Sequence, residues 1–261
     1  MKNFIHGILA VAALACTVSL SAQTPQSEAS AQSTQTAPTA DEIVGKYVAA
    51  IGGKDAISQV KSVYMETSVQ VMGNDSPGTT TIVDGVGYKS EVDFNGQKII
   101  QCVTDKNGWM VNPMAGAADP TPMPDEQYKA RKVEIYVAGP LYDYAAKGSK
   151  VELMVMEGDA YKIKLTTKDN IEFTYVIDPK SFLVTSVQSK GEMQGQEVNV
   201  TTKLSDYKKT EVGYVVPYAI DVNLGGQFTL TITVKKVELN KTIDPAVFAM
   251  PKPAEAPAAK Q

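Results

Sequence analysis

The sequence predicts a mainly β (α+β) fold: an incomplete, strongly curved antiparallel barrel of about eleven strands, covered by an N-terminal helix and an inserted helical segment. Three observations predict it. Many runs have the apolar and β-branched composition of strands, short turn sequences such as Asn95-Gly96 and Asn107-Gly108 join most of them, and only two stretches have helical periodicity. Short joints between successive strands indicate an antiparallel meander.

The N-terminal helix begins after a capping box, because Thr39 and Glu42 have the required spacing. An apolar stripe at helical spacing follows, formed by Ile43, Val44, Tyr47, Val48 and Ile51. Gly52-Gly53 ends this helix, and a short second helical turn is expected over 55–60.

Strand patterns begin after residue 61, where the apolar period changes to two. The predicted strands are 62–72, 79–94 (with a bend at Gly85 or Gly87), 97–104, 108–112, 151–156, 160–166, 171–177, 182–189, 197–204, 214–223 and 227–239. In the last of them, Phe228, Leu230, Ile232 and Val234 face one way and the intervening threonines face the other. A sheet with one apolar face needs a cover.

The long insertion over 113–150 supplies part of that cover. Its first part, 113–124, is a loop rich in proline, alanine and methionine. A helix is expected to start at Pro124 and to kink or break at Gly139-Pro140, with one apolar face formed by Ala130, Val133, Val137, Leu141 and Tyr144. A barrel of this size encloses more space than its own side chains fill, so an apolar ligand has room to bind.

The domain organisation follows from composition. Residues 1–22 are predicted to be a secretory signal peptide cleaved near Ala22, with cleavage before a lipidated Cys16 as the alternative. Residues 23–40 are a flexible linker, 41–251 form the folded half-barrel domain, and 252–261 are a disordered tail rich in proline and alanine. The protein is therefore expected in the periplasm, with an outer-membrane-anchored or secreted form left open.

Composition also excludes several function classes. The 261-residue chain has a net charge of −4 and a single arginine, Arg131, which argues against nucleic acid binding. Its one histidine, His6, lies in the signal peptide, so the mature chain lacks the histidine of Ser-His-Asp and Cys-His catalysis and of histidine zinc sites. With no phosphate loop, calcium loop or Cys-x-x-Cys motif, we predict no enzyme activity, no cofactor and no metal.

Cys102 is the remaining cysteine of the mature chain, so no intrachain disulfide can form. A two-residue turn at Asn95-Gly96 places Cys102 opposite Lys89, on the more polar face of the sheet. A neighbouring ammonium group can lower the pKa of a thiol. No activating partner is evident in the sequence, however, which favours a small strand residue without a redox role.

Candidate ligand-binding residues are the tryptophan, several methionines and two aromatic residues of one strand. Methionine fills irregular core gaps and is also frequent on surfaces that accept variable apolar partners. Trp109 can anchor the end of the sheet or form the mouth of a pocket. The candidates are Trp109, Met110, Met114, Met123, Met65, Met154, Phe173 and Tyr175; plain core packing is the alternative for the strand methionines Met65 and Met154.

Several short motifs, taken in order, resemble the outer-membrane lipoprotein-sorting (LolA/LolB-like) proteins of Gram-negative bacteria. They are Ile51-Gly52-Gly53-Lys54, Gly108-Trp109, Asn112-Pro113, Tyr175-x-Ile177-Asp178-Pro179 with Leu183, Gly213 with Val216-Pro217, and Ile243-Asp244 with Phe248 and Pro251. The resemblance implies an incomplete eleven-stranded barrel with a helical lid, whose apolar cavity holds lipoprotein acyl chains in transit across the periplasm. Such carriers have an arginine near the start of the sheet that helps to hold the lid. Here Arg131 lies in the inserted helix instead, so no lid residue is carried over.

The function that these observations predict is a periplasmic binding or carrier protein, monomeric, that holds lipid or lipoprotein acyl chains in an apolar cavity between the curved sheet and the helical lid. A partner protein in the inner or outer membrane is left open. The alternative is a non-catalytic interaction module of the cell envelope that uses the half-barrel as a scaffold and fills its interior with its own side chains.

Overall fold

The structure is a computed structural model that describes residues 37–71, 73–154, 158–193 and 195–252. The predicted signal peptide, most of the linker (23–36) and nearly all of the tail (253–261) lie outside the described residues. These domain assignments therefore stay predictions.

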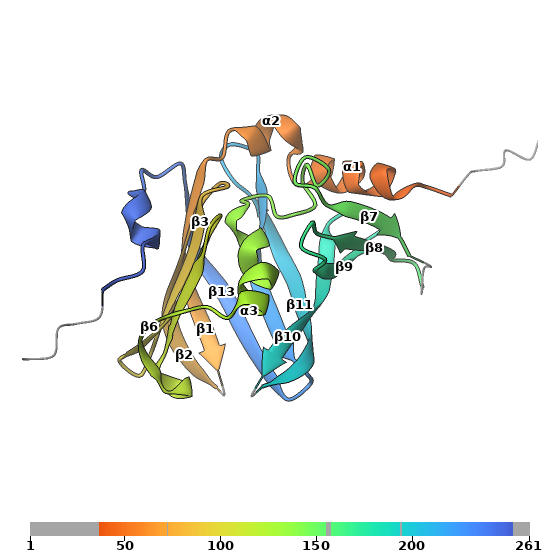
Figure 1. The fold of residues 1–261 in the computed structure, drawn as a ribbon. Helices are drawn as coiled ribbons and strands as arrows, with labels where there is room; N and C mark the ends of the chain where they lie inside the picture. The colour runs from red at the N-terminus through yellow and green to blue at the C-terminus, as the bar shows by residue number, and fades with distance from the viewer. Residues whose placement is uncertain (1–36, 72, 155–157, 194, 253–261) are drawn as a thin grey trace, which may run out of the picture. The chain divides into compact units, whose positions relative to one another are not determined.

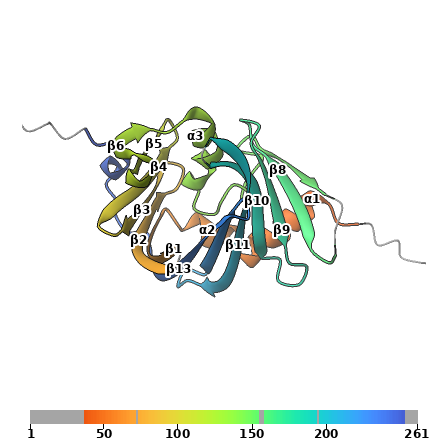
Figure 2. The same ribbon diagram turned by 90° about the horizontal axis from the view of Figure 1, so that it is seen from below.

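Within the described residues, thirteen antiparallel strands form one sheet that curves around a concave side (Figures 1 and 2). Their order is β6-β5-β4-β3-β2-β1-β13-β12-β11-β10-β9-β8-β7, so β6 and β7 are the two edges. The strands are β1 (Ser62–Val71), β2 (Asn74–Val83), β3 (Gly87–Phe94), β4 (Gln97–Thr104), β5 (Gly108–Asn112), β6 (Ala117–Pro122), β7 (Lys150–Leu153), β8 (Tyr161–Thr166), β9 (Glu172–Ile177), β10 (Val184–Met193), β11 (Gln196–Lys209), β12 (Val215–Leu224) and β13 (Phe228–Leu239). This open sheet confirms the predicted fold class.

The strand number differs from the prediction at two places. The run expected over 79–94 is two strands, because the chain turns between Val83 and Gly87 through Gly85 at φ 70°. In addition, β6 forms within the segment expected to be a loop, where Pro120 and Pro122 hide the strand pattern. Both prolines are tolerated because β6 is an edge strand.

The N-terminal helices agree with the sequence. In α1 (Ala40–Ala50), the Glu42 amide donates to Thr39 Oγ1 at 3.2 Å and the Thr39 amide donates to Glu42 Oε2 at 2.8 Å, which is the predicted capping box. Gly52, at φ 116°, separates α1 from α2 (Gly53–Ser58). The Ile43 and Val44 side chains are buried against strands of the concave side.

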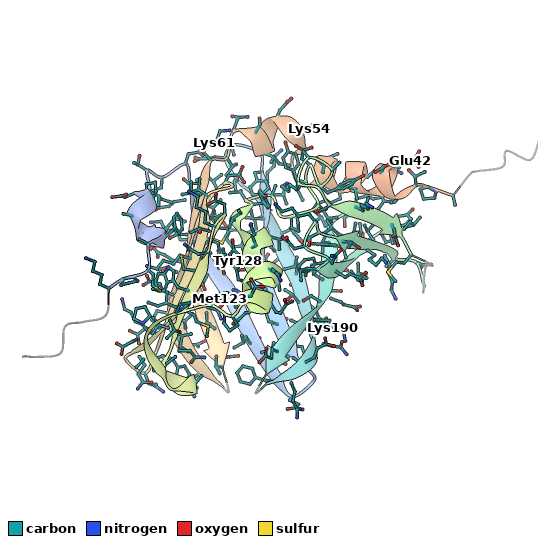
Figure 3. The ribbon with its side chains drawn as sticks, viewed as in Figure 1. Glu42, Lys54, Lys61, Met123, Tyr128 and Lys190 are labelled. Atoms are coloured by element: carbon teal, nitrogen blue, oxygen red, sulfur yellow. The ribbon has the colours of Figure 1, made fainter. Side chains whose placement is uncertain are left out.

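The inserted segment, residues 123–149, is here called the strap, because it connects the two edge strands β6 and β7. It begins with α3 (Asp125–Arg131), continues as a 3-10 helix, η2 (Lys132–Ile135), and ends in a series of turns. Figures 1 and 2 show α3 on the concave side of the sheet, and Figure 3 labels Met123 and Tyr128 of the strap near the centre of the view.

The predicted inserted helix is wrong in its length, since it loses helical geometry after Ile135. Backbone groups that a longer helix would use internally bind other elements instead. The Gly85 amide donates to Ile135 O at 2.9 Å, the Val137 amide donates to Asp84 Oδ1 at 3.0 Å, and the Tyr214 hydroxyl donates to Val137 O at 2.8 Å. The strap is thereby fixed to the β2–β3 turn and to the start of β12.

Both faces of the sheet carry a cover. On the concave side, α1, α2 and the strap pack on three buried clusters, which contain Ile43 with Leu165, Ile57 with Val63, and Val103 with Ile135. On the convex side, a C-terminal 3-10 helix, η3 (Pro245–Phe248), shown in blue beside β3 in Figure 1, covers Cys102 and Trp109.

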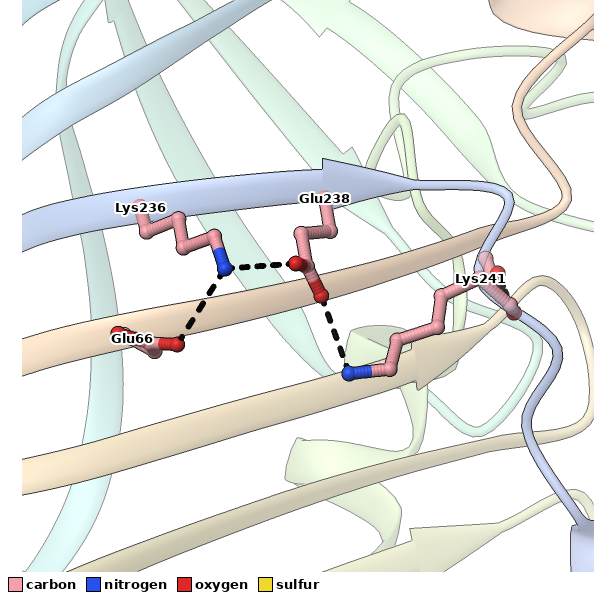
Figure 4. A network of polar contacts seen from close by, with 5 residues as sticks. Glu66, Lys236, Glu238 and Lys241 are labelled. Carbon is pink, nitrogen blue, oxygen red and sulfur yellow. Dashed lines mark hydrogen bonds and ion pairs between the residues drawn. The ribbon is translucent and has the colours of Figure 1, made fainter.

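Elsewhere on the convex side the described strands present charged side chains. Figure 4 shows such a network on β1 and β13, where Lys236 Nζ lies 2.7 Å from Glu238 and 3.8 Å from Glu66. Lys241 Nζ lies 3.0 Å from the same Glu238 carboxylate. These side chains are a third to a half exposed, so the network contributes little to stability and marks the solvated face.

Candidate functional site

The concave face has an apolar part beyond its helical cover. We call it the open apolar face, and it consists of Val69, Val71, Val200, Ile220, Val222, Leu224, Phe228, Leu230 and Ile232. Except for Val69, which is 6% exposed, these side chains are only partly buried. None of the nine is among the residues of the buried clusters described above.

Strand register places these side chains in three rows. Val69, Ile232 and Ile220 are consecutive cross-strand partners on β1, β13 and β12. Val71, Leu230 and Val222 form the next row, and Phe228, Leu224 and Val200 form the third. Directly opposed residues project to one side of a sheet, so the rows make a continuous apolar surface.

This surface is on the covered side of the sheet. Along β1, side chains alternate between faces, and Val63 points to the same side as Val69 and Val71. Val63 is buried under α2 and the strap. The open apolar face is therefore the continuation of the concave core past the end of its cover.

Directly under the strap the side chains pack closely. Ile135, Ala138 and Leu141 are at most 5% exposed and contact the clusters beneath them. The room expected under the cover is thus filled by the protein itself, and the accessible apolar surface lies beside the strap.

One side of the strap is charged where it meets the concave face. Arg131 Nη2 lies 2.9 Å from Glu134 Oε2, and the Tyr88 hydroxyl of β3 interacts with the same guanidinium group. Burial raises the pKa of the Glu134 carboxyl group above its usual value, although Arg131 offsets part of the shift. Burial and the nearby Glu134 carboxylate also raise the pKa of Tyr88.

Four of the predicted site residues pack on the concave side in two pairs. Met110 and Met123 belong to one cluster, in which Met123 is 7% exposed. The rings of Phe173 and Tyr175 on β9 lie 6.4 Å apart in another, and Tyr175 is also 7% exposed. Met65 packs separately, against the cluster around Val63.

Trp109 lies on the opposite, convex side. Its indole Nε1 donates to Phe248 O at 2.8 Å and its side chain is 1% exposed, which corresponds to the anchoring role considered for it. It also forms part of the wall of a hollow of about 560 Å³ between the β4–β5 turn and the C-terminal segment, lined further by Val86, Lys106, Pro122, Phe248 and Met250. This hollow is separate from the open apolar face.

The other two candidates are exposed. Met114 in the turn after β5 is 62% exposed and Met154 after β7 is 40% exposed, so the structure does not bring them together with the rest. The alternation within 227–239 already marked Phe228, Leu230 and Ile232 as apolar. What the sequence did not indicate was which part of that face the helices leave uncovered.

The predicted register and face of Cys102 are confirmed, since it pairs with Lys89 on the convex side of the sheet. Its surroundings there are not polar, because Phe248 covers it and the side chain is fully buried. Burial raises the pKa of the Cys102 thiol to about 12, and the Lys89 ammonium group offsets only part of this. The thiol is therefore protonated at neutral pH, as a structural cysteine would be.

Two further searches of the described residues bear on the site. Within them, no three histidine, cysteine, aspartate or glutamate side chains are grouped so that they could hold a metal ion. Over the same residues, no helix has the length and hydrophobicity needed to cross a membrane.

Comparison with solved structures relates this open sheet to known proteins. A LolA superfamily protein from Nitrosomonas europaea matches with a TM-score of 0.54 over 82% of this chain and 98% of its own, at 12% sequence identity. This chain has a LolA-like fold. The resemblance seen in the sequence motifs is thereby confirmed at the level of the fold, and low sequence identity limits the likeness to the fold.

Two other structures share this fold. A DUF1329 family protein from Desulfovibrio piger matches with a TM-score of 0.52 at 13% identity, over 80% of this chain and 97% of its own. A structure described as an outer membrane lipoprotein-sorting protein domain, from Vibrio parahaemolyticus, matches with a TM-score of 0.50 at 10% identity, over 79% and 94%. No protein-family model and no curated protein sequence matches the chain.

Proposed function

We propose that this protein binds the acyl chain of a lipid or lipoprotein in the periplasm, with the open apolar face as its contact surface. The proposal rests on one observation: three rows of partly buried Val, Leu, Ile and Phe side chains continue the concave core beyond its cover. A LolA-like fold, shared with a lipoprotein-sorting protein domain, supports this ligand class.

The energetics favour an acyl chain as occupant. Each buried methylene contributes about 0.8 kcal/mol, so a chain of about 14 methylenes gains on the order of 10 kcal/mol before the cost of ordering. The rows also lose solvent contact on binding, as expected for an exposed apolar patch that serves as a binding surface.

The test compares two neighbouring residues of β13 whose side chains project to opposite faces. Leu230→Asn places an amide in the middle row of the open apolar face, whereas Thr229→Asn changes the convex face. We expect Leu230→Asn to weaken the binding of a fluorescent fatty acid about tenfold and Thr229→Asn to leave it unchanged. Native mass spectrometry that finds only the bare polypeptide after incubation with lipids would contradict the proposal.

A second candidate function is the interaction module of the cell envelope. The observation that favours it is the close packing of Ile135, Ala138 and Leu141 beneath the strap, since this hypothesis requires an interior filled by native side chains. Purification from the periplasm distinguishes the two. A stoichiometric protein partner with no bound lipid supports the module, and bound lipid supports the acyl-chain site.

A further inference from the structure

The concave side of the sheet is not uniformly apolar, because one part of it carries a polar group of side chains. Arg131 and Glu134 project from the strap, and Tyr88, Ser90 and Thr80 come from β2 and β3. Tyr88 interacts with Arg131 and with both hydroxyl side chains, so the five residues form one connected group. We call it the Arg131 group.

The distance between the Arg131 group and the open apolar face is within the length of a long acyl chain. Thr80 is the cross-strand partner of Met65 on β1, and Val69 and Val71 follow four and six residues further along the same face. At about 3.3 Å per residue, these side chains are roughly 13 Å and 20 Å from the Met65 position. A long acyl chain covers such a distance, so one molecule can reach both places.

Arg131 and Glu134 are deeply set and yet accessible. Burial is the largest influence on the ionisation of both groups, and nevertheless 25% of the Arg131 side chain and 32% of the Glu134 side chain are exposed. The pair is therefore open to a ligand that binds on the concave side.

The hydrogen bonding of the guanidinium group is incomplete. Nη2 binds Glu134, but the Nε–H is buried and has no acceptor among the residues that the structure describes. A buried donor without an acceptor is destabilising, so a ligand oxygen atom that enters far enough to accept from Nε–H would remove this cost. Arginine presents Nε and Nη2 as a fork that matches the two oxygens of a carboxylate or phosphate.

We infer that the Arg131 group binds the anionic head, a carboxylate or a phosphate ester, of an amphiphile whose chain lies along the open apolar face. This inference rests on the proposed function, because the chain supplies most of the affinity. Glu134 is the internal competitor: its carboxylate holds Nη2 until the head group replaces it and engages Nη2 and Nε together. The ligand class is thus an anionic amphiphile rather than a neutral one.

The experiment measures dissociation constants for three ligands with the same hydrocarbon chain: palmitate, hexadecyl phosphate and hexadecanol. The full-length protein should bind at least one anionic ligand about tenfold or more tightly than hexadecanol, as expected for a charge-assisted pair of hydrogen bonds. Arg131→Gln should remove this preference and keep the affinity for hexadecanol. Glu134→Gln should strengthen anion binding, because the competing carboxylate is gone.

Two further variants make the test independent of folding defects. Arg131→Gln leaves Glu134 without its partner, so the double variant Arg131→Gln, Glu134→Gln removes both charges and should bind all three ligands alike. Lys129→Gln removes one positive charge from the exposed side of the same helix and should leave every ratio unchanged.

The outcomes separate the two proposals. Equal affinity of the unmodified protein for the three ligands, or an anion preference that survives in the double variant, would overturn the role of the Arg131 group and leave the acyl-chain site standing. No binding of any of the three would overturn both. A preference for palmitate over hexadecyl phosphate, or the reverse, would identify which acid the group accepts.

Discussion

Replacing Gly87 by alanine tests how the C-terminal segment is held on the sheet. A Cβ atom at this position would lie 2.7, 2.8 and 2.9 Å from three carbons of the Phe248 ring, closer than real Cβ contacts. The ring cannot easily retreat, because Phe248 O accepts hydrogen bonds from Trp109 Nε1 at 2.8 Å and from Cys102 Sγ at 3.4 Å. We expect Gly87→Ala to lower the free energy of unfolding by about 1–3 kcal/mol.

The assay is urea denaturation followed by circular dichroism and by fluorescence. Trp109 is the only tryptophan of the chain and contacts Phe248, so its emission reports on this contact directly. The double variant Gly87→Ala, Phe248→Leu should lose less stability than the two single changes added together, because the smaller side chain removes the overlap. Additive losses, or an unchanged stability and emission in Gly87→Ala, would refute the reasoning.

Three further predictions concern buried polar groups. In a Cys16→Ser chain, a thiol reagent at neutral pH should modify Cys102 only on unfolding, because burial holds its pKa near 12; rapid modification of the folded protein would contradict this. The pKa of the Glu134 carboxyl group is raised above 4.5 in the folded state, so its contribution to stability is complete below pH 4.5 and is lost as the pH rises through the folded pKa. Urea titrations over that pH range should show the unmodified protein losing stability relative to Glu134→Gln. A difference in stability that does not change with pH would contradict this. Tyr214→Phe removes the hydrogen bond to Val137 O and should cost about 1 kcal/mol by thermal unfolding, with faster amide exchange in the strap; unaltered exchange would show that this bond does not hold the strap.

Local signals in the sequence predicted the elements that local interactions determine. The capping box at Thr39 and the Asn95-Gly96 turn need only neighbouring residues, and both form as expected. Asn95 and Gly96 have φ values of 55° and 80°, which is the geometry that pairs Phe94 with Gln97 and fixes the Lys89–Cys102 register.

Features that depend on distant contacts were not predictable in the same way. Cys102 is buried by Phe248, which lies 146 residues further along the chain. The hydrophobic periodicity of a sequence does not indicate which distant residue will cover a side chain. The inserted helix ends early because Asp84, Gly85 and Tyr214 compete for its backbone groups. For the site, alternation identified which side chains are apolar, whereas the extent of the strap decides which of them stay accessible.

The strap also explains why the sheet stays open. Its ends continue directly into the edge strands β6 and β7, which do not pair with each other. The segment that joins them packs on the concave side of the sheet. In β6, Pro120 and Pro122 provide no backbone N–H, which weakens any ladder that a further strand could form there. In this open sheet the rows around Leu230 remain only partly buried, which is what the proposed acyl-chain site requires.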